Sequence, residues 1–244
     1  MRQSLISLLR IQNNEPSMRA ESSPQVLTDV SVDPFVRGLL HRPANPRGGI
    51  VLTHGAGSNC QAPLLIALAE AFSDAGFVVL RCDLPFRQDR PYGPPGPGDA
   101  KRDRAGLKNA MAAIKNLAAG RVFLAGHSYG GRQASMLCAE LPEKAPEEAA
   151  GLLLLSYPLH PPRKPEQLRT QHFFNLRTPA LFVQGTRDPF GSIAEIEQAL
   201  KLIPAKTRLL PIEGAGHDLG FKAKAGREAL SAKVLAEFQA FFAG

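Results

Sequence analysis

The sequence of 244 residues has few cysteines and no long apolar run. Its three cysteines are odd in number, and no pair has the spacing of a metal site. Such a set favours small buried thiols in a reducing, cytoplasmic compartment over a disulfide framework. No apolar stretch approaches the roughly 18 residues of a transmembrane helix, so we expect no membrane span. Internal repeats are absent as well.

Charge of a single sign is not concentrated anywhere along the chain. The formal net charge is +7, but basic clusters such as residues 101–104 (KRDR) contain their own acidic residue. This pattern is typical of a solvated surface, so we expect no nucleic-acid partner. Residues 1–10 resemble a signal peptide only faintly, because their apolar stretch is short and ends at Arg10. We therefore expect a loose N-terminal extension over residues 1–24 and one domain over residues 25–244.

Apolar runs and helical patterns alternate along most of the chain. The alternation predicts strands at 49–54, 77–82, 121–126, 151–157, 179–185 and 207–213, and helices at 63–75, 99–119, 129–141, 192–202 and 222–242. Because the strand runs are apolar almost throughout, they fit a parallel sheet that is buried on both faces. The sequence therefore predicts an α/β fold with a doubly wound, mostly parallel sheet. One or two antiparallel strands are expected at its edge, over residues 26–42.

Residues 126–130 (GHSYG) stand between an expected strand and an expected helix. The pattern G-x-S-x-G in this context is the nucleophile elbow. Its glycines let the strand and the helix approach each other, and the strained turn pushes the serine hydroxyl outward. Ser128 is therefore the candidate nucleophile. The alternative is a serine that only fills a tight turn.

Two later loops supply candidate partners for this serine. Asp188 and His217 each follow an apolar run, just past the end of an expected strand. A serine nucleophile needs a base that is oriented by a third group. His217 would take the proton from Ser128, and Asp188 would hold the imidazole in the required tautomer. Glu213 and Asp83 are alternative candidates for the acid.

A glycine-bearing loop, residues 54–58 (HGAGS), follows the first expected parallel strand. Backbone N–H groups of such a loop can stabilise a developing oxyanion. We assign one donor to Ala56, with either flanking glycine as the alternative, and the second donor to Tyr129. The same region partly matches a dinucleotide-binding fingerprint, but Cys60 stands where that fingerprint requires its third glycine.

Two irregular stretches, residues 91–98 and 158–178, also follow expected strand ends, where open α/β sheets bind ligands. The second is long enough for only a small flap, so we expect an open site with little or no lid. Candidate substrate-binding residues in the loops past the expected strand ends are Phe86, Arg87, Tyr157, Arg163 and Phe190. The cations among them suggest a carboxylate-bearing acyl substrate as a hypothesis. Arginines that only solvate the surface are the alternative.

With elbow, acid, base and oxyanion loop in order, residues 26–244 resemble the α/β-hydrolase superfamily. Longer phrases resemble one branch of it, which includes testis-expressed protein 30, subunit 3 of the non-specific lethal histone-acetyltransferase complex, and small bacterial dienelactone-hydrolase-like proteins. These phrases are residues 52–57 (LTHGAG), 83–87 (DLPFR), 126–133 (GHSYGGRQ), 156–160 (SYPLH) and 185–190 (GTRDPF). Dienelactone hydrolases proper carry a cysteine at the elbow, where this chain has Ser128. That difference argues against a dienelactone substrate.

The resemblance implies an α/β-hydrolase fold and a serine hydrolase, similar to carboxylesterases, that cleaves an ester, thioester or amide bond. It implies a small-molecule acyl substrate and neither a cofactor nor a metal ion. Some members of the resembled branch serve as interaction subunits. The alternative function is therefore a catalytically weak or inactive protein that acts as an interaction module. The sequence leaves the oligomeric state open.

Overall fold

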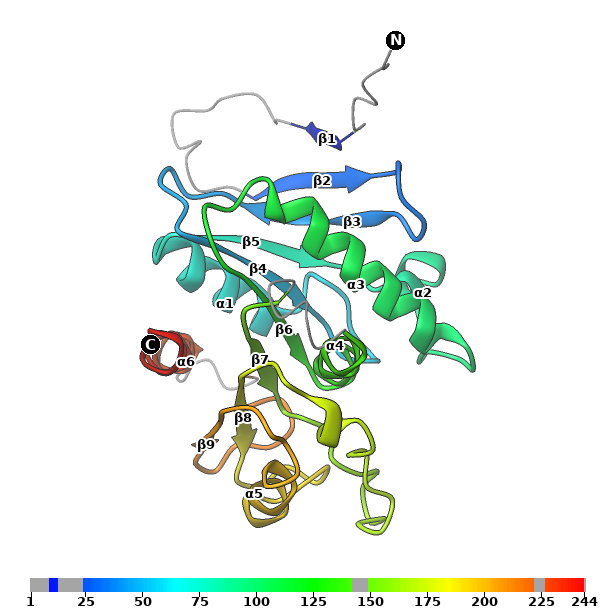
Figure 1. Ribbon diagram of the computed structural model, residues 1–244, viewed down its shortest axis with the longest axis vertical. Helices are drawn as coiled ribbons and strands as arrows, with labels where there is room; N and C mark the ends of the chain where they lie inside the picture. The colour runs from blue at the N-terminus through cyan, green and yellow to red at the C-terminus, as the bar shows by residue number, and fades with distance from the viewer. Residues whose placement is uncertain (1–8, 13–23, 142–148, 222–226, 244) are drawn as a thin grey trace.

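A computed structural model describes residues 9–12, 24–141, 149–221 and 227–243. Its centre is a nine-stranded sheet with the order β1-β2-β3-β5-β4-β6-β7-β8-β9 (Figure 1). The strands are β1 (Leu9–Gln12), β2 (Gln25–Asp29), β3 (Val36–His41), β4 (Gly48–Thr53), β5 (Phe77–Cys82), β6 (Val122–His127), β7 (Leu152–Leu155), β8 (Ala180–Gly185) and β9 (Thr207–Ile212). All pairings from β5 across to β9 are parallel. The mostly parallel sheet expected from the sequence is confirmed.

The leading strands are antiparallel, as predicted, but the sheet extends one strand further than expected. β2 pairs antiparallel with β3, and β3 pairs antiparallel with β5. β1 lies within the expected loose extension and pairs antiparallel with β2, from Leu9 opposite Asp29 to Gln12 opposite Val26. Apart from β1 and Pro24, the extension lies outside the described residues.

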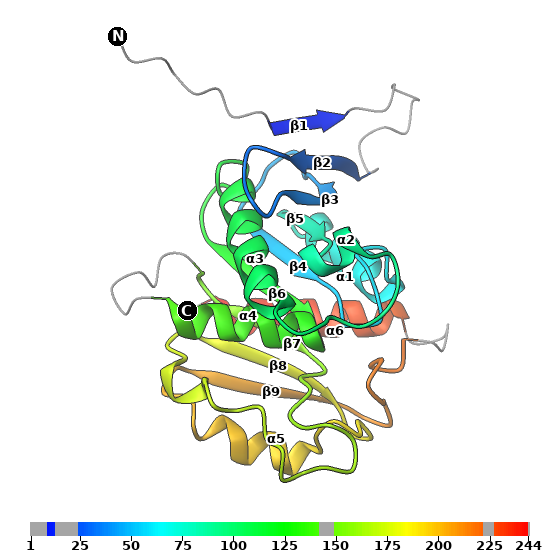
Figure 2. The same cartoon turned by 90° about the vertical axis from the view of Figure 1, so that its right-hand side faces the viewer.

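Helices cover both faces of the sheet (Figure 2). α3 (Asp99–Lys115), α4 (Tyr129–Glu140) and α5 (Ile193–Leu200) pack on one face, and α1 (Pro63–Asp74) and α6 (Arg227–Phe242) pack on the other. Each face of the sheet has its own hydrophobic core, and successive residues of a strand point into the two cores in turn. In β7, Leu152 and Leu154 face α4, while Leu153 and Leu155 face α6. Such two-sided burial explains why the strands read as unbroken apolar runs.

Two short helical elements were not predicted: α2 (Pro85–Asp89) and the 3-10 helix η2 (Phe173–Asn175). α2 begins with a proline in its first turn, which suits a helix start because proline lacks an N–H group. η2 belongs to the segment between β7 and β8, all of which the structure describes. That segment holds only η2 and loops, so no lid domain stands there. Within the described ranges, every helix is too short or too polar to cross a lipid bilayer.

Candidate active site

Ser128 lies between the end of β6 and the first residue of α4, in a backbone conformation with φ 50° and ψ −115°. Such values are strained for a residue other than glycine and tend to occur at functional sites. The flanking glycines explain how the chain turns so tightly. A Cβ atom on Gly126 would lie 2.5 Å from the backbone nitrogen of Gly131, and one on Gly130 would lie 2.5 Å from the carbonyl oxygen of His54. The predicted elbow is therefore present.

A chain of hydrogen bonds joins the three residues that the sequence singled out. The Ser128 Oγ lies 2.8 Å from His217 Nε2, and His217 Nδ1 lies 2.8 Å from Asp188 Oδ2. Asp188 is buried at the end of β8, and its Oδ1 also accepts a hydrogen bond from the backbone N–H of Phe190 at 2.9 Å. Glu213 instead contacts Thr186. Since Asp188 carries the contact with the imidazole, the two alternative acids are not needed.

Two rings fix the position of the His217 loop. The Phe190 ring lies against the His217 imidazole, with ring centroids 4.2 Å apart and an interplanar angle of 32°. On the other side, His127 Nε2–H donates to the His217 carbonyl oxygen at 2.8 Å. Burial lowers the pKa of His127 to about 4, so this ring is neutral near neutral pH. His127 therefore holds the loop that carries the base.

The two assigned oxyanion donors lie in the first turn of α4 and in the loop after β4. Tyr129 is the first residue of α4, and the first N–H groups of a helix have no partner within the helix. Ala56 lies in the loop after β4. That loop is held by His54, whose Nδ1–H donates to the Gly55 carbonyl at 2.9 Å while its Nε2 accepts from the Leu84 N–H at 3.1 Å. Burial lowers the pKa of His54, which suits a neutral ring with both nitrogens satisfied.

Arg87 holds the same loop and not a substrate. The side chain is buried, and its guanidinium donates to four backbone carbonyls. The acceptors are Ser58 at 2.8 Å, Arg90 at 3.1 Å, Ala56 at 2.8 Å and Gly93 at 2.9 Å. With these contacts the guanidinium fixes Ala56, the residue that the sequence assigns as one oxyanion donor. The prediction that Arg87 binds the substrate, through a carboxylate, is wrong.

The sequence profile described as "Alpha/beta hydrolase domain" matches residues 46–242. The chain belongs to this α/β-hydrolase family. Among solved structures, it is similar to a dienelactone hydrolase from Anabaena variabilis, with a TM-score of 0.67 and 22% identity over 89% of this chain and 97% of that chain. It is also similar to Est1E from Butyrivibrio proteoclasticus, with a TM-score of 0.67 and 16% identity over 91% and 100% of the two chains.

A Pyrococcus furiosus esterase gives a TM-score of 0.68 and 17% identity over 94% of this chain and 95% of that chain. At these identities, the likenesses show a shared fold. The narrower branch indicated by the longer sequence phrases stays a prediction.

Two other residues expected to bind substrate are part of the core of this α/β-hydrolase. Phe86 is 1% exposed and packs edge-to-face on Tyr129, with ring centroids 5.7 Å apart. Tyr157 is fully buried, and its hydroxyl donates to the Arg169 carbonyl at 2.8 Å. Their side chains turn away from solvent, so both predictions are wrong. Phe190 lies at the site as expected, whereas Arg163 is exposed on the loop after β7, in a left-handed conformation with φ 61°.

One functional residue was missed altogether. Asp103 of α3 is fully buried, and its Oδ2 accepts a hydrogen bond from the Tyr129 hydroxyl at 2.7 Å. Its Oδ1 accepts from the Phe86 N–H at 3.0 Å. Burial raises the pKa of this carboxyl. Asp103 thereby ties the start of α4 to α2, and the only sequence signal for it was an acidic residue within a basic run.

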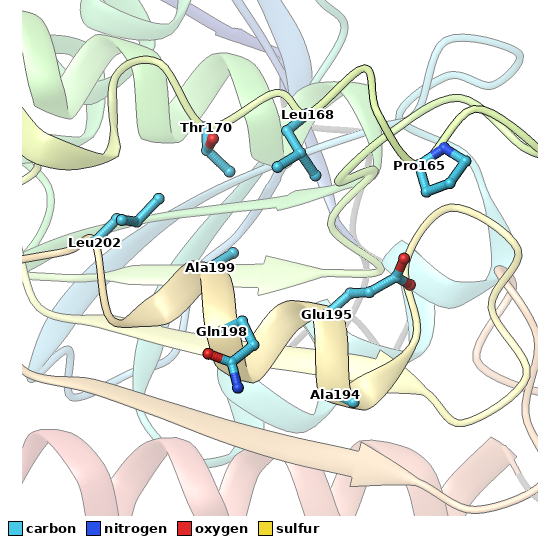
Figure 3. A pocket seen from close by; sticks show the side chains of 8 residues that line it. All are labelled: Pro165, Leu168, Thr170, Ala194, Glu195, Gln198, Ala199 and Leu202. Atoms are coloured by element: carbon cyan, nitrogen blue, oxygen red, sulfur yellow. The ribbon is translucent and has the colours of Figure 1, made fainter.

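Two cavities are lined by residues that the structure describes. The larger, about 420 Å³, is lined by segment 165–170 and α5 (Figure 3). None of its lining residues belongs to the hydrogen-bonded group around Ser128. The smaller, about 270 Å³, includes Gly55 and His127 among its lining residues and therefore adjoins Ser128.

The cysteines take no part in the site. Cys60, Cys82 and Cys138 are all buried, as expected. Burial raises the pKa of Cys60 to about 12, which leaves it protonated and unreactive near neutral pH. Within the described ranges, no group of three or more His, Cys, Asp or Glu side chains is placed to hold a metal ion.

Proposed function

We propose that this α/β-hydrolase is a serine hydrolase that cleaves an ester, thioester or amide by acyl transfer to water. The observation that carries the proposal is the continuous pair of contacts at 2.8 Å from Ser128 Oγ to His217 and from His217 to Asp188. A serine hydroxyl becomes a useful nucleophile only when such a base accepts its proton. The strained backbone at Ser128 supports the same role, because it holds the hydroxyl at the open edge of the sheet.

The first half of the reaction forms an acyl-enzyme. Ser128 Oγ attacks the substrate carbonyl carbon while its proton passes to His217 Nε2. Asp188 stabilises the imidazolium that results. The C–O, C–S or C–N bond to the leaving group then breaks, and His217 returns the proton to that group. In the second half, water loses a proton to His217 and attacks the acyl carbon. The Ser128 ester bond breaks, the acid departs, and Ser128 regains its proton.

The oxyanion that forms in each half would accept hydrogen bonds from the N–H groups of Ala56 and Tyr129. Donors that are already fixed in place cost no reorganisation when charge develops. Arg87 and His54 restrain the carbonyls beside the first donor, and the helix start restrains the second. The reaction needs no cofactor or metal ion. A cytoplasmic location and a small-molecule acyl substrate, without a nucleic-acid partner, stay predictions from the sequence.

The test is covalent labelling with a fluorophosphonate probe, followed by peptide mapping. The wild-type protein should be labelled at Ser128 and should hydrolyse a small activated ester. Ser128→Ala should abolish labelling and reduce kcat by about 10⁴ to 10⁶. Ser31→Ala is the matched control, because Ser31 is exposed between β2 and β3, where its hydroxyl donates to Asp29. A folded wild-type protein that is neither labelled nor active would instead support the interaction module.

A further inference from the structure

The smaller cavity, about 270 Å³, reaches the candidate active site from the side of α1. Three of its lining residues are sequence neighbours of the proposed catalytic groups. Gly55 precedes Ala56, His127 precedes Ser128, and Asp218 follows His217. The other lining residues are Ser58, Ala62, Pro63, Leu64, Leu65 and Phe221.

One residue of the cavity wall, Gly55, lies close to the nucleophile. A Cβ atom built on Gly55 would lie 3.4 Å from the Ser128 Cβ and 3.1 Å from His127 Nδ1. Because Gly55 has no side chain, the backbone of this loop packs directly against Ser128 and His127. A substrate carbonyl held between Ser128 and the Ala56 N–H would therefore have the cavity entrance next to it.

The chemistry of the wall selects against negative charge. Most of the lining is aliphatic or aromatic, contributed by the first turn of α1 and by Phe221. Among the described residues that line the cavity, none is a lysine or an arginine. Of the two lining side chains that can ionise, His127 is neutral near neutral pH, and the other, Asp218, is an acid. An apolar group gains from leaving water for such a cavity, whereas a carboxylate would lose hydration without finding a cation.

We propose that this cavity is an acyl pocket, which holds the unbranched, uncharged acyl chain of a medium-chain ester or thioester. The inference rests on the proposed function and adds the substrate class to it. A volume of about 270 Å³ corresponds to about nine water-sized units of about 30 Å³ each. That space suits a chain of roughly six to eight carbons, since a methylene group is of similar size. The carboxylate-bearing substrate considered from the sequence loses its support, because Arg87 is fully engaged elsewhere.

The first experiment measures kcat/KM for p-nitrophenyl esters from acetate to dodecanoate. Each methylene that enters the pocket should raise kcat/KM by roughly three- to fourfold, since its burial is favourable by about 0.8 kcal/mol. The rise should end at about six to eight carbons, where the cavity is full. A matched pair of butanoate and hemisuccinate esters should favour the neutral compound by tenfold or more. A flat series, or preference for the hemisuccinate, would overturn the acyl pocket.

The second experiment fills the pocket with one substitution. Ala62 lines the pocket at the start of α1 and is partly exposed, so Ala62→Phe adds volume without crowding the core. This variant should lower the ratio of octanoate to acetate turnover at least tenfold. Ala194→Phe is the matched control, because Ala194 lines the separate cavity of Figure 3 and is exposed. It should keep the wild-type ratio.

The outcomes separate this inference from the proposed function. If Ala62→Phe and the milder Ala62→Leu both keep the wild-type ratio, the chain lies elsewhere and the acyl pocket is wrong, even though acetate turnover still depends on Ser128. If Ala194→Phe lowers the ratio as much as Ala62→Phe does, the chain does not select this cavity, and the inference is again overturned. If the wild-type protein hydrolyses no ester and resists the probe, the proposed function itself fails.

Discussion

Three histidine side chains of this α/β-hydrolase have two different roles, which their neighbours determine. His217 lies between a serine hydroxyl and a carboxylate, at 2.8 Å from each. His54 and His127 each donate to a backbone carbonyl, and burial lowers the pKa of both. A neutral ring that hydrogen-bonds only to backbone groups holds a loop in place. A ring that receives a proton on one nitrogen needs an anion at the other, and among these three only His217 has a carboxylate hydrogen-bonded to its ring.

The first prediction at this scale concerns Asp188→Asn. An asparagine of the same shape keeps the contact but offers no charge and favours the wrong tautomer of His217. We expect kcat to fall by about 10⁴, as such a change can cause in a serine–histidine–aspartate arrangement. Steady-state kinetics with the acetate ester measure the effect, and an unchanged melting temperature shows that the fold is intact. A loss below tenfold would mean that Asp188 does not act through His217.

At the scale of elements, the oxyanion loop is held by a helix that the sequence did not predict. α2 is a short helix of five residues, which begins at Pro85 and includes Arg87. The guanidinium donates hydrogen bonds both to the loop after β4 and to segment 90–93, so it links these two stretches of backbone to α2. Phe86 below it packs on Tyr129 and under the Arg87 guanidinium, which lies 4.9 Å from its ring centroid. The loop that carries the proposed donor is therefore braced through α2.

Arg87→Met tests this bracing, because methionine keeps much of the apolar length and removes all the donors. We expect kcat to fall by about 10- to 100-fold with little change in KM, since the oxyanion forms only in the transition state. Affinity for a boronic acid that mimics the tetrahedral intermediate should fall in parallel. Arg102→Met is the matched control, because Arg102 is an exposed residue of α3 that pairs with Asp89. It should leave both quantities near wild type. Equal losses in kcat/KM for the two variants would show that Arg87 has no positioning role.

The same elements show what sequence reading captures at this site. Ser128, Asp188 and His217 were predicted because each sits in a short motif at the end of a buried strand, and strand ends of a parallel sheet meet at one edge. Phe86, Arg87 and Tyr157 lie on the correct loops, but their side chains point inward. Side-chain direction in a loop depends on tertiary packing, which no local pattern reports. For the same reason, the sequence could not predict that residues of α1 line the acyl pocket.

At the scale of the whole molecule, the sequence predicts the bounds of a strand best where every residue of that strand is buried. β4 and β5 are buried at every position, and their apolar runs gave their bounds to within about one residue. β1 is different, since its four residues form a strand only by pairing with the exposed edge of β2. Such a short segment has no strong pattern of its own. Long-range pairing, and not local preference, places it in the sheet.

The junction between the antiparallel and parallel parts of the sheet gives the last prediction. His41 of β3 is 5% exposed, and its Nε2 accepts a hydrogen bond from the Arg81 Nε–H of β5 at 2.9 Å. Burial, with a smaller contribution from the nearby Arg81 charge, lowers the pKa of His41 to about 4. Between about pH 6.5 and 4, the unfolded chain therefore binds a proton that the native protein does not. The contribution of His41 to the free energy of unfolding is complete above this window and is lost as the pH falls through it.

His41→Gln should remove this dependence, because the glutamine carbonyl oxygen can still accept from Arg81 and does not titrate. Urea unfolding at pH 5 and pH 7 measures the effect. The wild-type protein should lose about 2 kcal/mol more than the variant between these two values, from about 1.5 pH units at about 1.4 kcal/mol each. Above about pH 7.5 the two stabilities should run parallel, since histidine is neutral there in both states. Equal losses between pH 7 and pH 5 would mean that protonation of His41 does not loosen the junction of β3 with β5.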